Sequence, residues 1–209
     1  NGRSFVADGD YLYWPVNFTN KIFRTLKDGS GPIETVADTE PGPLDLIVVG
    51  TTVYWTDSIG VWGKRIDCDE LPCGGTAKTK YDDFPNNAFA YGLIYKPVSG
   101  FGPFGGGFRL YWVERTGSSP SFTSKIVYRS CNFDVVCFTE FAPDPPNPTP
   151  EPPDPVTFHA TSPGRVIGDL VMDGDNIFWT ERDGTQGFVY RKAYNAALAD
   201  PAGEIGSNQ

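Results

Sequence analysis

Three observations in the sequence predict an all-β protein of four repeated, four-stranded antiparallel sheets. Aromatic residues make up 14% of the chain, and glycine and proline occur 24 and 19 times, which is typical of a folded protein rich in strands and turns. No stretch keeps a helical period for three turns. One short pattern recurs four times, with a tryptophan at the same place in each copy: Trp14, Trp55, Trp112 and Trp179.

Each repeat has an apolar run and a tight turn, then an aromatic pair, a polar turn, and a short apolar strand that ends in a basic residue. The aromatic pairs are Tyr13-Trp14, Tyr54-Trp55, Tyr111-Trp112 and Phe178-Trp179. The basic residues are Arg24, Arg65, Arg129 and Arg191. The first two tryptophans are 41 residues apart, which matches the roughly 40–45 residues of a four-stranded propeller blade. The sequence therefore predicts a propeller-like fold, with insertions in the longer repeats.

The repeats set the expected boundaries within a single propeller-like domain over residues 1–209. We expect blade 1 at about 4–37, blade 2 at 44–81, blade 3 at 89–141 and blade 4 at 165–206. A Gly-rich loop at 100–107 interrupts blade 3. A Pro-rich insertion at 142–156 is expected between blades 3 and 4, because proline lacks the N–H that a sheet interior needs.

Two shorter signals refine this outline. Asp-Gly at 8–9 and 173–174 predicts tight hairpins, because such turns need a positive φ. Residues 193–199 are the one short helical candidate, stopped by Pro201.

Composition argues against several classes of function. The net charge of −9 disfavours nucleic acid, because phosphate contacts need clustered Lys and Arg, and it disfavours docking on anionic lipid. No apolar run approaches the roughly 20 residues of a membrane span. The chain begins Asn1-Gly2-Arg3 without Met, so we expect a mature or trimmed product, or part of a longer one.

The stretch Tyr54-Trp55-Thr56-Asp57, its three variant copies and the trailing Arg strand resemble the YWTD-type propeller repeats of the low-density lipoprotein receptor family. They are more similar still to secreted bacterial repeat propellers, in which a VYW strand and an Arg strand precede a loop ending in Cys-Gly-Gly, as in residues 65–75. The resemblance implies a propeller, secretion and a binding role, with no catalytic residues to carry over. Pro15 stands where Thr is usual, and four repeats are fewer than the six or more that such rings have.

The four cysteines form two pairs close in sequence, Cys68 with Cys73 and Cys131 with Cys137, each just after an Arg strand. Their equivalent positions and even number predict two local disulfides and an oxidising compartment, extracellular or periplasmic. A four-cysteine zinc site is the alternative, and it would require the two pairs to converge from different blades.

Other candidate site residues are few. His159 is the only histidine, and we interpret it as a satisfied surface residue. The candidate calcium ligands are Asp8, Asp10, Asp173 and Asp175, although no full calcium-loop pattern is present and no other cofactor is expected. Asn17 begins a glycosylation sequon. The tryptophans are expected to be buried between blades, and the recurring Arg either pairs with the acidic residue after Trp (Asp57, Glu114 or Glu181) or ends its strand in solvent.

These features favour a non-enzymatic, extracellular or cell-surface interaction or structural module that binds a protein partner or its own copies. The first alternative is a carbohydrate-binding propeller with Phe101, Phe104 and Phe108 as stacking platforms. The second is a hydrolase with a loop-borne carboxylate site, which the fold class does not exclude.

We also expect that the four blades are not a self-sufficient closed ring. Open end faces would then be completed by further blades of a longer chain, or would pack on other copies, head-to-tail if the two faces differ.

Overall fold

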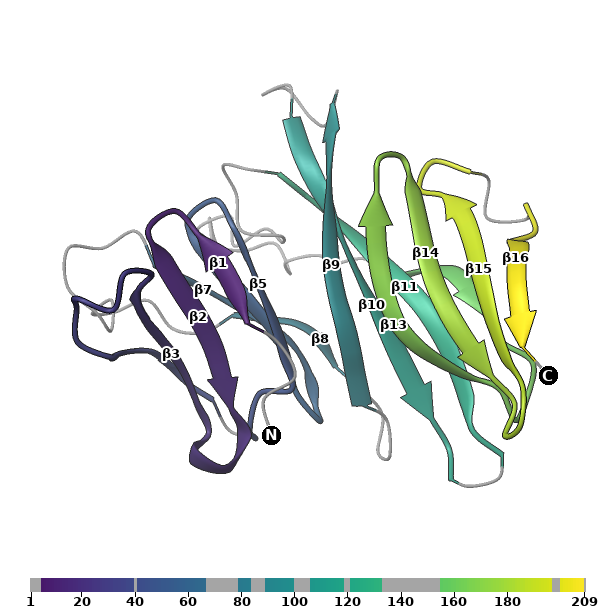
Figure 1. Cartoon of the computed structure of the whole chain (residues 1–209), viewed down its shortest axis with the longest axis horizontal. Coiled ribbons are helices and arrows are strands. Elements are labelled where there is room, and N and C mark those ends of the chain that lie inside the picture. Colours follow the sequence, from purple (N-terminus) through teal and green to yellow (C-terminus); the bar gives the residue numbers. More distant parts are fainter. Residues whose placement is uncertain are drawn as a thin grey trace, which may run out of the picture. The chain divides into compact units, whose positions relative to one another are not determined.

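The computed structural model of the chain describes residues 5–39, 41–66, 79–83, 89–99, 106–118, 121–132, 155–196 and 200–208. These residues form four antiparallel four-stranded sheets, and each sheet uses four strands that are consecutive in the sequence (Figure 1). We call the sheets blades 1 to 4. The predicted all-β, propeller-like class of four repeated sheets is confirmed.

The strands follow one another within each blade in sequence order. Blade 1 consists of β1 (Val6–Asp8), β2 (Tyr11–Val16), β3 (Lys21–Leu26) and β4 (Glu34–Asp38), with the 3-10 turn η1 (Asn17–Thr19) after β2. Blade 2 consists of β5 (Asp45–Val49), β6 (Thr52–Thr56), β7 (Gly60–Arg65) and β8 (Thr79–Asp83). Blade 3 consists of β9 (Phe89–Ser99), β10 (Gly106–Thr116), β11 (Thr123–Asn132) and β12 (Val156–Ala160). Blade 4 consists of β13 (Val166–Asp173), β14 (Asn176–Arg182), β15 (Gly187–Ala193) and β16 (Gly203–Asn208).

The predicted Asp-Gly hairpins are confirmed. Gly9 joins β1 to β2 and Gly174 joins β13 to β14, with φ of +48° and +57°. Both values lie in the left-handed region, which glycine enters without the steric cost of a Cβ.

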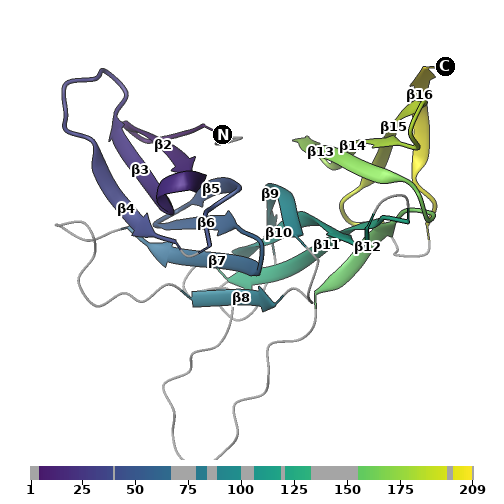
Figure 2. The same ribbon diagram turned by 90° about the horizontal axis from the view of Figure 1, so that it is seen from below.

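The chain divides into two compact units, Asn1–Leu93 and Ile94–Gln209, with the boundary inside β9. Unit 1 holds blades 1 and 2. Figure 2 shows the ribbons of these two blades beside each other. Their facing sides form one apolar cluster: Tyr13, Ile22, Val36 and Ala37 from blade 1, with Leu46, Val48, Val53 and Trp55 from blade 2. Successive strand residues point to opposite faces. Tyr13 therefore faces blade 2 while its neighbour Trp14 lies on the other side of blade 1.

Unit 2 repeats this arrangement. The ring of Tyr111 on β10 meets Phe158 on β12 edge to face at 5.6 Å, and Phe158 meets Trp179 of blade 4 at 6.4 Å. In both units, then, the aromatic residue before Trp packs toward the following blade, and the tryptophan of that blade packs back. We call these two sides the Tyr face and the Trp face of a blade.

The four tryptophans occupy the same strand but are not equally buried. Each lies on the second strand of its blade, opposite Phe23, Trp62, Val127 or Tyr190 on the third. Trp55, Trp112 and Trp179 are at most 1% exposed, whereas Trp14 is only half-buried. The expectation of four equivalent buried positions is therefore wrong for Trp14, because among the described residues of unit 1 no blade covers its face.

Three boundaries differ from the sequence-based expectation. β12 is the fourth strand of blade 3, so the Pro-rich stretch lies inside that blade, between its third and fourth strands, and not between blades 3 and 4. The alternating pattern of Val156–Ala160 is the strand signal that was missed. Blade 4 extends past the expected end at residue 206, because its outer strand, β16, continues to Asn208. The helical candidate at 193–199 is wrong over its described part, because Ala193 ends β15 and residues 194–196 form turns.

Gly42 lies in the connection from blade 1 to blade 2 and must remain a glycine. A Cβ built on it would overlap the backbone carbonyl of Asn17, whose side-chain amide donates to the Gly42 carbonyl at 3.2 Å. A Cβ on Gly206, in contrast, meets nothing within 4 Å.

We therefore expect Gly42→Ala to lower the free energy of unfolding by about 1–3 kcal/mol, the usual cost of overpacking. Gly206→Ala is the matched control and should change it by less than about 1 kcal/mol. Urea unfolding of both variants measures the difference, and equal effects would show that the Gly42 contact does not constrain unit 1.

Candidate functional site

Two of the buried tryptophans hold a carboxylate on their own strand. The indole Nε1 of Trp112 donates to Glu114 at 3.2 Å, and that of Trp179 donates to Glu181 at 3.0 Å. Residues two apart on a strand share a face, so the pattern Trp-x-Glu brings the acid back over the ring. The acidic residue after Trp thus has a role in the interface between blades.

Blade 2 has an aspartate in this place, and its contacts differ. Asp57 Oδ1 accepts from the backbone N–H groups of Ile59 and Gly60 at 2.8 and 2.9 Å, and so shapes the turn into β7. Among the described residues, the Nε1 of Trp55 has no hydrogen-bond partner.

The hypothesis that the recurring Arg pairs with this acid is wrong for blades 3 and 4. Glu114 faces Lys125 across the strands and binds it at 2.6 Å, while Arg129 stands opposite Leu110. Arg191 is exposed and stands opposite Phe178, on the other side of the sheet from Glu181. The reason is register, since the Arg position falls beside or before the aromatic pair and not after it.

In blade 1, where no acid follows Trp14, the arginine binds elsewhere. Arg24 donates to Glu34 of the outer strand at 2.7 Å and lies over the ring of Tyr11 at 4.2 Å.

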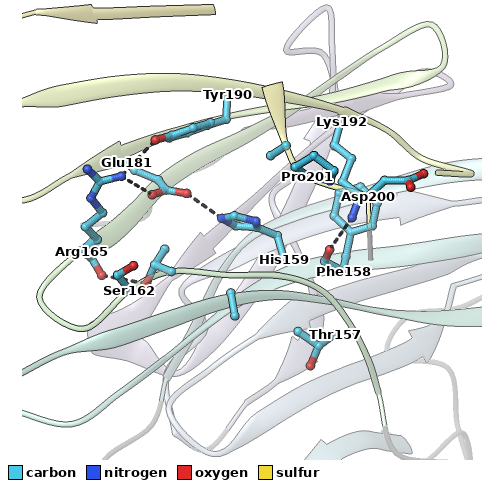
Figure 3. A pocket seen from close by; sticks show the side chains of 13 residues that line it. Thr157, Phe158, His159, Ser162, Arg165, Glu181, Tyr190, Lys192, Asp200 and Pro201 are labelled. Carbon is cyan, nitrogen blue, oxygen red and sulfur yellow. Dashed lines mark hydrogen bonds and ion pairs between the residues drawn. The ribbon is translucent and has the colours of Figure 1, made fainter. Parts of the chain in front are cut away.

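The candidate functional site is a hollow of about 460 Å³ in unit 2, between β12 and blade 4. Figure 3 shows four polar side chains pointing toward one another: His159 from β12, Glu181 from β14, Tyr190 from β15 and Arg165 from the turn before β13. Lys192, also from β15, points toward the carbonyl of Phe158. The residues 200–202 close one side.

His159 is not the surface residue that we expected. Its side chain is 21% exposed, and its Nε2 lies 2.7 Å from Oε1 of Glu181, which is 3% exposed. Its ring lies 4.8 Å from that of Trp179 and 6.3 Å from that of Tyr190. His159 therefore joins the last strand of blade 3 to the second strand of blade 4.

Glu181 is the centre of this network. Burial raises the pKa of its carboxyl, but the hydrogen bonds from His159 and Trp179 and the positive charge of Arg165 outweigh burial and hold the pKa below its ordinary value. Arg165 lies 3.6 Å from Glu181 and donates to the Tyr190 hydroxyl at 3.0 Å. The carboxylate is thus ionised at neutral pH, with Oε1 bound by His159 and Trp179 and Oε2 paired with Arg165.

Lys192 lies beside this network and is 5% exposed. Its Nζ donates to the backbone carbonyl of Phe158 at 3.2 Å and lies 4.8 Å from the ring centre of that residue. Burial lowers the pKa of this ammonium group, and the negative charge of Asp200 acts in the opposite direction.

These contacts fasten two sheets together. In a Ser-His-Asp arrangement the carboxylate and the nucleophile bind opposite nitrogens of the imidazole. Here the hydrogen bond with Glu181 is the one that the His159 ring makes to the described residues. No local signal in the sequence indicates this site. Strand alternation predicts that Phe158 and His159 point to opposite sides, but the register shift in β12 lets both rings contact Trp179.

The two turns with candidate calcium ligands each receive a lysine. Lys27 donates to the carbonyl of Gly9, and Lys96 donates to the carbonyl of Gly174 at 2.6 Å and to Asp175 at 3.0 Å. Within the described ranges, no three His, Cys, Asp or Glu side chains are grouped to hold a metal ion. Calcium binding by Asp8, Asp10, Asp173 and Asp175 therefore gains no support from these turns.

The remaining predicted residues are placed as follows. Asn17, of the sequon, uses its amide nitrogen to bind Gly42. Cys131 is 2% exposed and disulfide-bonded. Its partner and the other predicted pair lie outside the described residues, so the two pairings stay predictions.

The carbohydrate platform expected at Phe108 is wrong, because that side chain is 3% exposed and packs edge to face against Tyr95 at 6.4 Å. Phe101 and Phe104, the other two members of that platform, lie outside the described residues.

No protein-family model matches the chain, and no curated protein is significantly similar to it in sequence. Among the described residues there is no helix with the length and apolar character that a bilayer crossing requires.

The two kinds of tryptophan allow a matched test. Trp179→Phe removes both ring area and a donor to a buried carboxylate, whereas Trp55→Phe removes ring area alone. A hydrogen bond to a charged group contributes about 1.5–3 kcal/mol. We expect Trp179→Phe to lower the free energy of unfolding by about that much more than Trp55→Phe in urea titrations. Equal losses would show that the Glu181 contact adds nothing to stability.

Glu181 also predicts a pH dependence. Its folded-state pKa lies below the unfolded value of about 4.3, so its contribution is fully present above that value and is lost as pH falls through the folded-state pKa. Glu181→Gln should therefore destabilise the protein at pH 7, with a gap from wild type that narrows below about pH 4. Urea unfolding between pH 7 and pH 3 measures this gap. Glu204→Gln, an exposed control, should follow the wild-type profile, and a constant gap for Glu181→Gln would contradict the assignment.

Proposed function

We propose that the chain is a non-enzymatic interaction module that acts outside the cell and binds a polypeptide through the Trp face of blade 1. One observation carries the proposal: among the described residues of unit 1, nothing covers the side of blade 1 that corresponds to the side on which blades 2 and 4 bury their tryptophans. Phe5 on this side is 75% exposed, whereas Leu46 and Leu170, which stand opposite Trp55 and Trp179, are 1% and 6% exposed.

The side chains of this face form an ordered aromatic row. Trp14 stacks on Phe5 with ring centres 6.3 Å apart and on Phe23 at 6.0 Å, with interplanar angles of 30° and 29°. Leu12, two residues before Trp14 on the same side of β2, is half-buried. Aromatic side chains contribute large contact area at little entropic cost and dominate binding energy at protein interfaces. A contiguous apolar patch of this kind is typical of an association surface.

Two further features support this reading. The chain resembles secreted repeat propellers in its aromatic and Arg strands, and the disulfide at Cys131 fits an oxidising compartment. His159, the only histidine of the chain, is bound to Glu181 between two blades, so it serves the packing of unit 2.

A photo-cross-linker tests the binding face. We expect p-benzoylphenylalanine at position 5 to form polypeptide adducts, including adducts with the protein itself, when the purified protein is irradiated alone and in an extract of its source. Phe18, 84% exposed on η1, is the matched control position and should give none. Mass spectrometry identifies the adducts. An absence of polypeptide adducts at position 5, or equal yields at both positions, would refute the proposed function.

A further inference from the structure

Blade 4 has an open side of its own, its Tyr face, opposite to the side that meets blade 3. On it Val171 is 57% exposed and Val189 is 37% exposed, and Phe178 between them is half-buried. A hollow of about 450 Å³ lies along this blade, lined in part by Thr180, Val189 and Gly206. Strands β13 to β16 lie side by side and carry these residues (Figure 1).

This open side repeats, position by position, the side of blade 1 that covers blade 2. Val171 stands opposite Phe178 as Val6 stands opposite Tyr13. The other equivalent positions follow from the same registers: Thr180 for Pro15, Val189 for Ile22, Gly206 for Ala37 and Arg191 for Arg24. In blade 1 the residues Val6, Tyr13, Ile22 and Ala37 pack in one cluster with Leu46, Val48, Val53 and Trp55. The Tyr face of blade 4 is thus one half of a known interface, without its second half.

The Trp face of blade 1 is the kind of surface that packs on a Tyr face in the interface between blades 1 and 2. Trp14 and its opposite residue Phe23 occupy the positions of Trp55 and Trp62 in blade 2. Phe5, stacked on Trp14, continues the register to the position of Leu46, and Leu12 occupies that of Val53. The side chains that blade 2 presents to blade 1 therefore recur on blade 1, with nothing in unit 1 to receive them among the described residues.

The two open sides differ from their counterparts in the size of single side chains. The Trp face of blade 1 has a larger side chain than blade 2 at two positions, Phe5 for Leu46 and Leu12 for Val53, and a smaller one at two others, Ala7 for Val48 and Phe23 for Trp62. The Tyr face of blade 4 has smaller ones than blade 1, Val189 for Ile22 and Gly206 for Ala37, and the hollow lies beside them. Interfaces pack at the density of protein interiors, so a larger knob needs a deeper recess.

We propose that the Tyr face of blade 4 in one copy of this chain docks on the Trp face of blade 1 in a second copy, and that the contact reproduces the interface between blades 1 and 2. The inference rests on the proposed function and names its partner. The two surfaces differ, so the contact is head-to-tail and leaves one open face of each kind on every assembly that does not close.

Sedimentation velocity of the full 209-residue chain over a concentration series tests this, with two variants that each block one face. Phe5→Glu puts a charge on the Trp face of blade 1, and Val171→Glu puts one on the Tyr face of blade 4. Both positions are more than half exposed, so the fold should be retained, and circular dichroism checks it. Phe18→Glu is the matched control, since Phe18 lies on neither face. Phe5→Ser and Val171→Ser repeat the test should either charged variant fail to fold.

We expect the wild type and Phe18→Glu to associate as concentration rises, and each face variant alone to stay monomeric. An equimolar mixture of the two face variants should form pairs and nothing larger, because one intact face of each kind remains. A wild type that stays monomeric at every concentration, through closure of blade 4 on blade 1 of the same chain or otherwise, overturns the proposal, as does a mixture without pairs. If position 5 then cross-links a different polypeptide, the proposed function stands and only the identity of the partner fails.

Discussion

The interlocking of one blade's Tyr face with the next blade's Trp face is the interaction on which the structure depends. Because strand residues alternate sides, two adjacent aromatic residues serve two different interfaces, one on each side of the sheet. Trp55 and Trp179 are then covered by what the preceding blade offers: the Tyr13 side for Trp55, and Phe158 with His159 for Trp179. Each blade therefore contributes one face to an interface on either side, and its stability depends on how well both faces are covered.

The sequence predicted the repeat well, because its signal is local. The aromatic pair, the Asp-Gly turns and the trailing strand are contiguous in the chain, and their recurrence located the second and third strands of all four blades. The sequence did not predict β12 as the fourth strand of blade 3. β12 pairs with β11 although an insertion separates them, and the Pro-rich stretch was interpreted as the boundary between blades 3 and 4. Periodicity in Val156–Ala160 predicts a strand but does not say to which sheet it belongs.

The candidate site could not be predicted from local sequence patterns, because it too depends on contacts between distant segments. His159, Glu181 and Arg165 come from three segments, and only the packing of blade 3 on blade 4 brings them together. The acidic residue after Trp was considered as one of two possible partners for the recurring Arg, the other being solvent, and in blades 3 and 4 it accepts from the indole of that Trp instead. The position of the recurring Arg depends on strand register, which places Arg191 opposite Phe178. The indole of Trp179, two residues before Glu181, lies on the same side as that acid because side chains alternate along a strand.

The placement of the insertion within blade 3 has a consequence for the order in which unit 2 folds. Lys125 on β11 pairs with Ala160 on β12, 35 residues later, whereas Lys21 on β3 pairs with Asp38 on β4, 17 residues later. Doubling a loop adds only about 0.6 kcal/mol of closure entropy, but long-range pairing delays the step that depends on it. β12 carries both Phe158 and His159, so Trp179 waits for this late strand before it is covered. Until that pairing forms, the indole side of blade 4 is a surface that a chaperone or a second chain can meet.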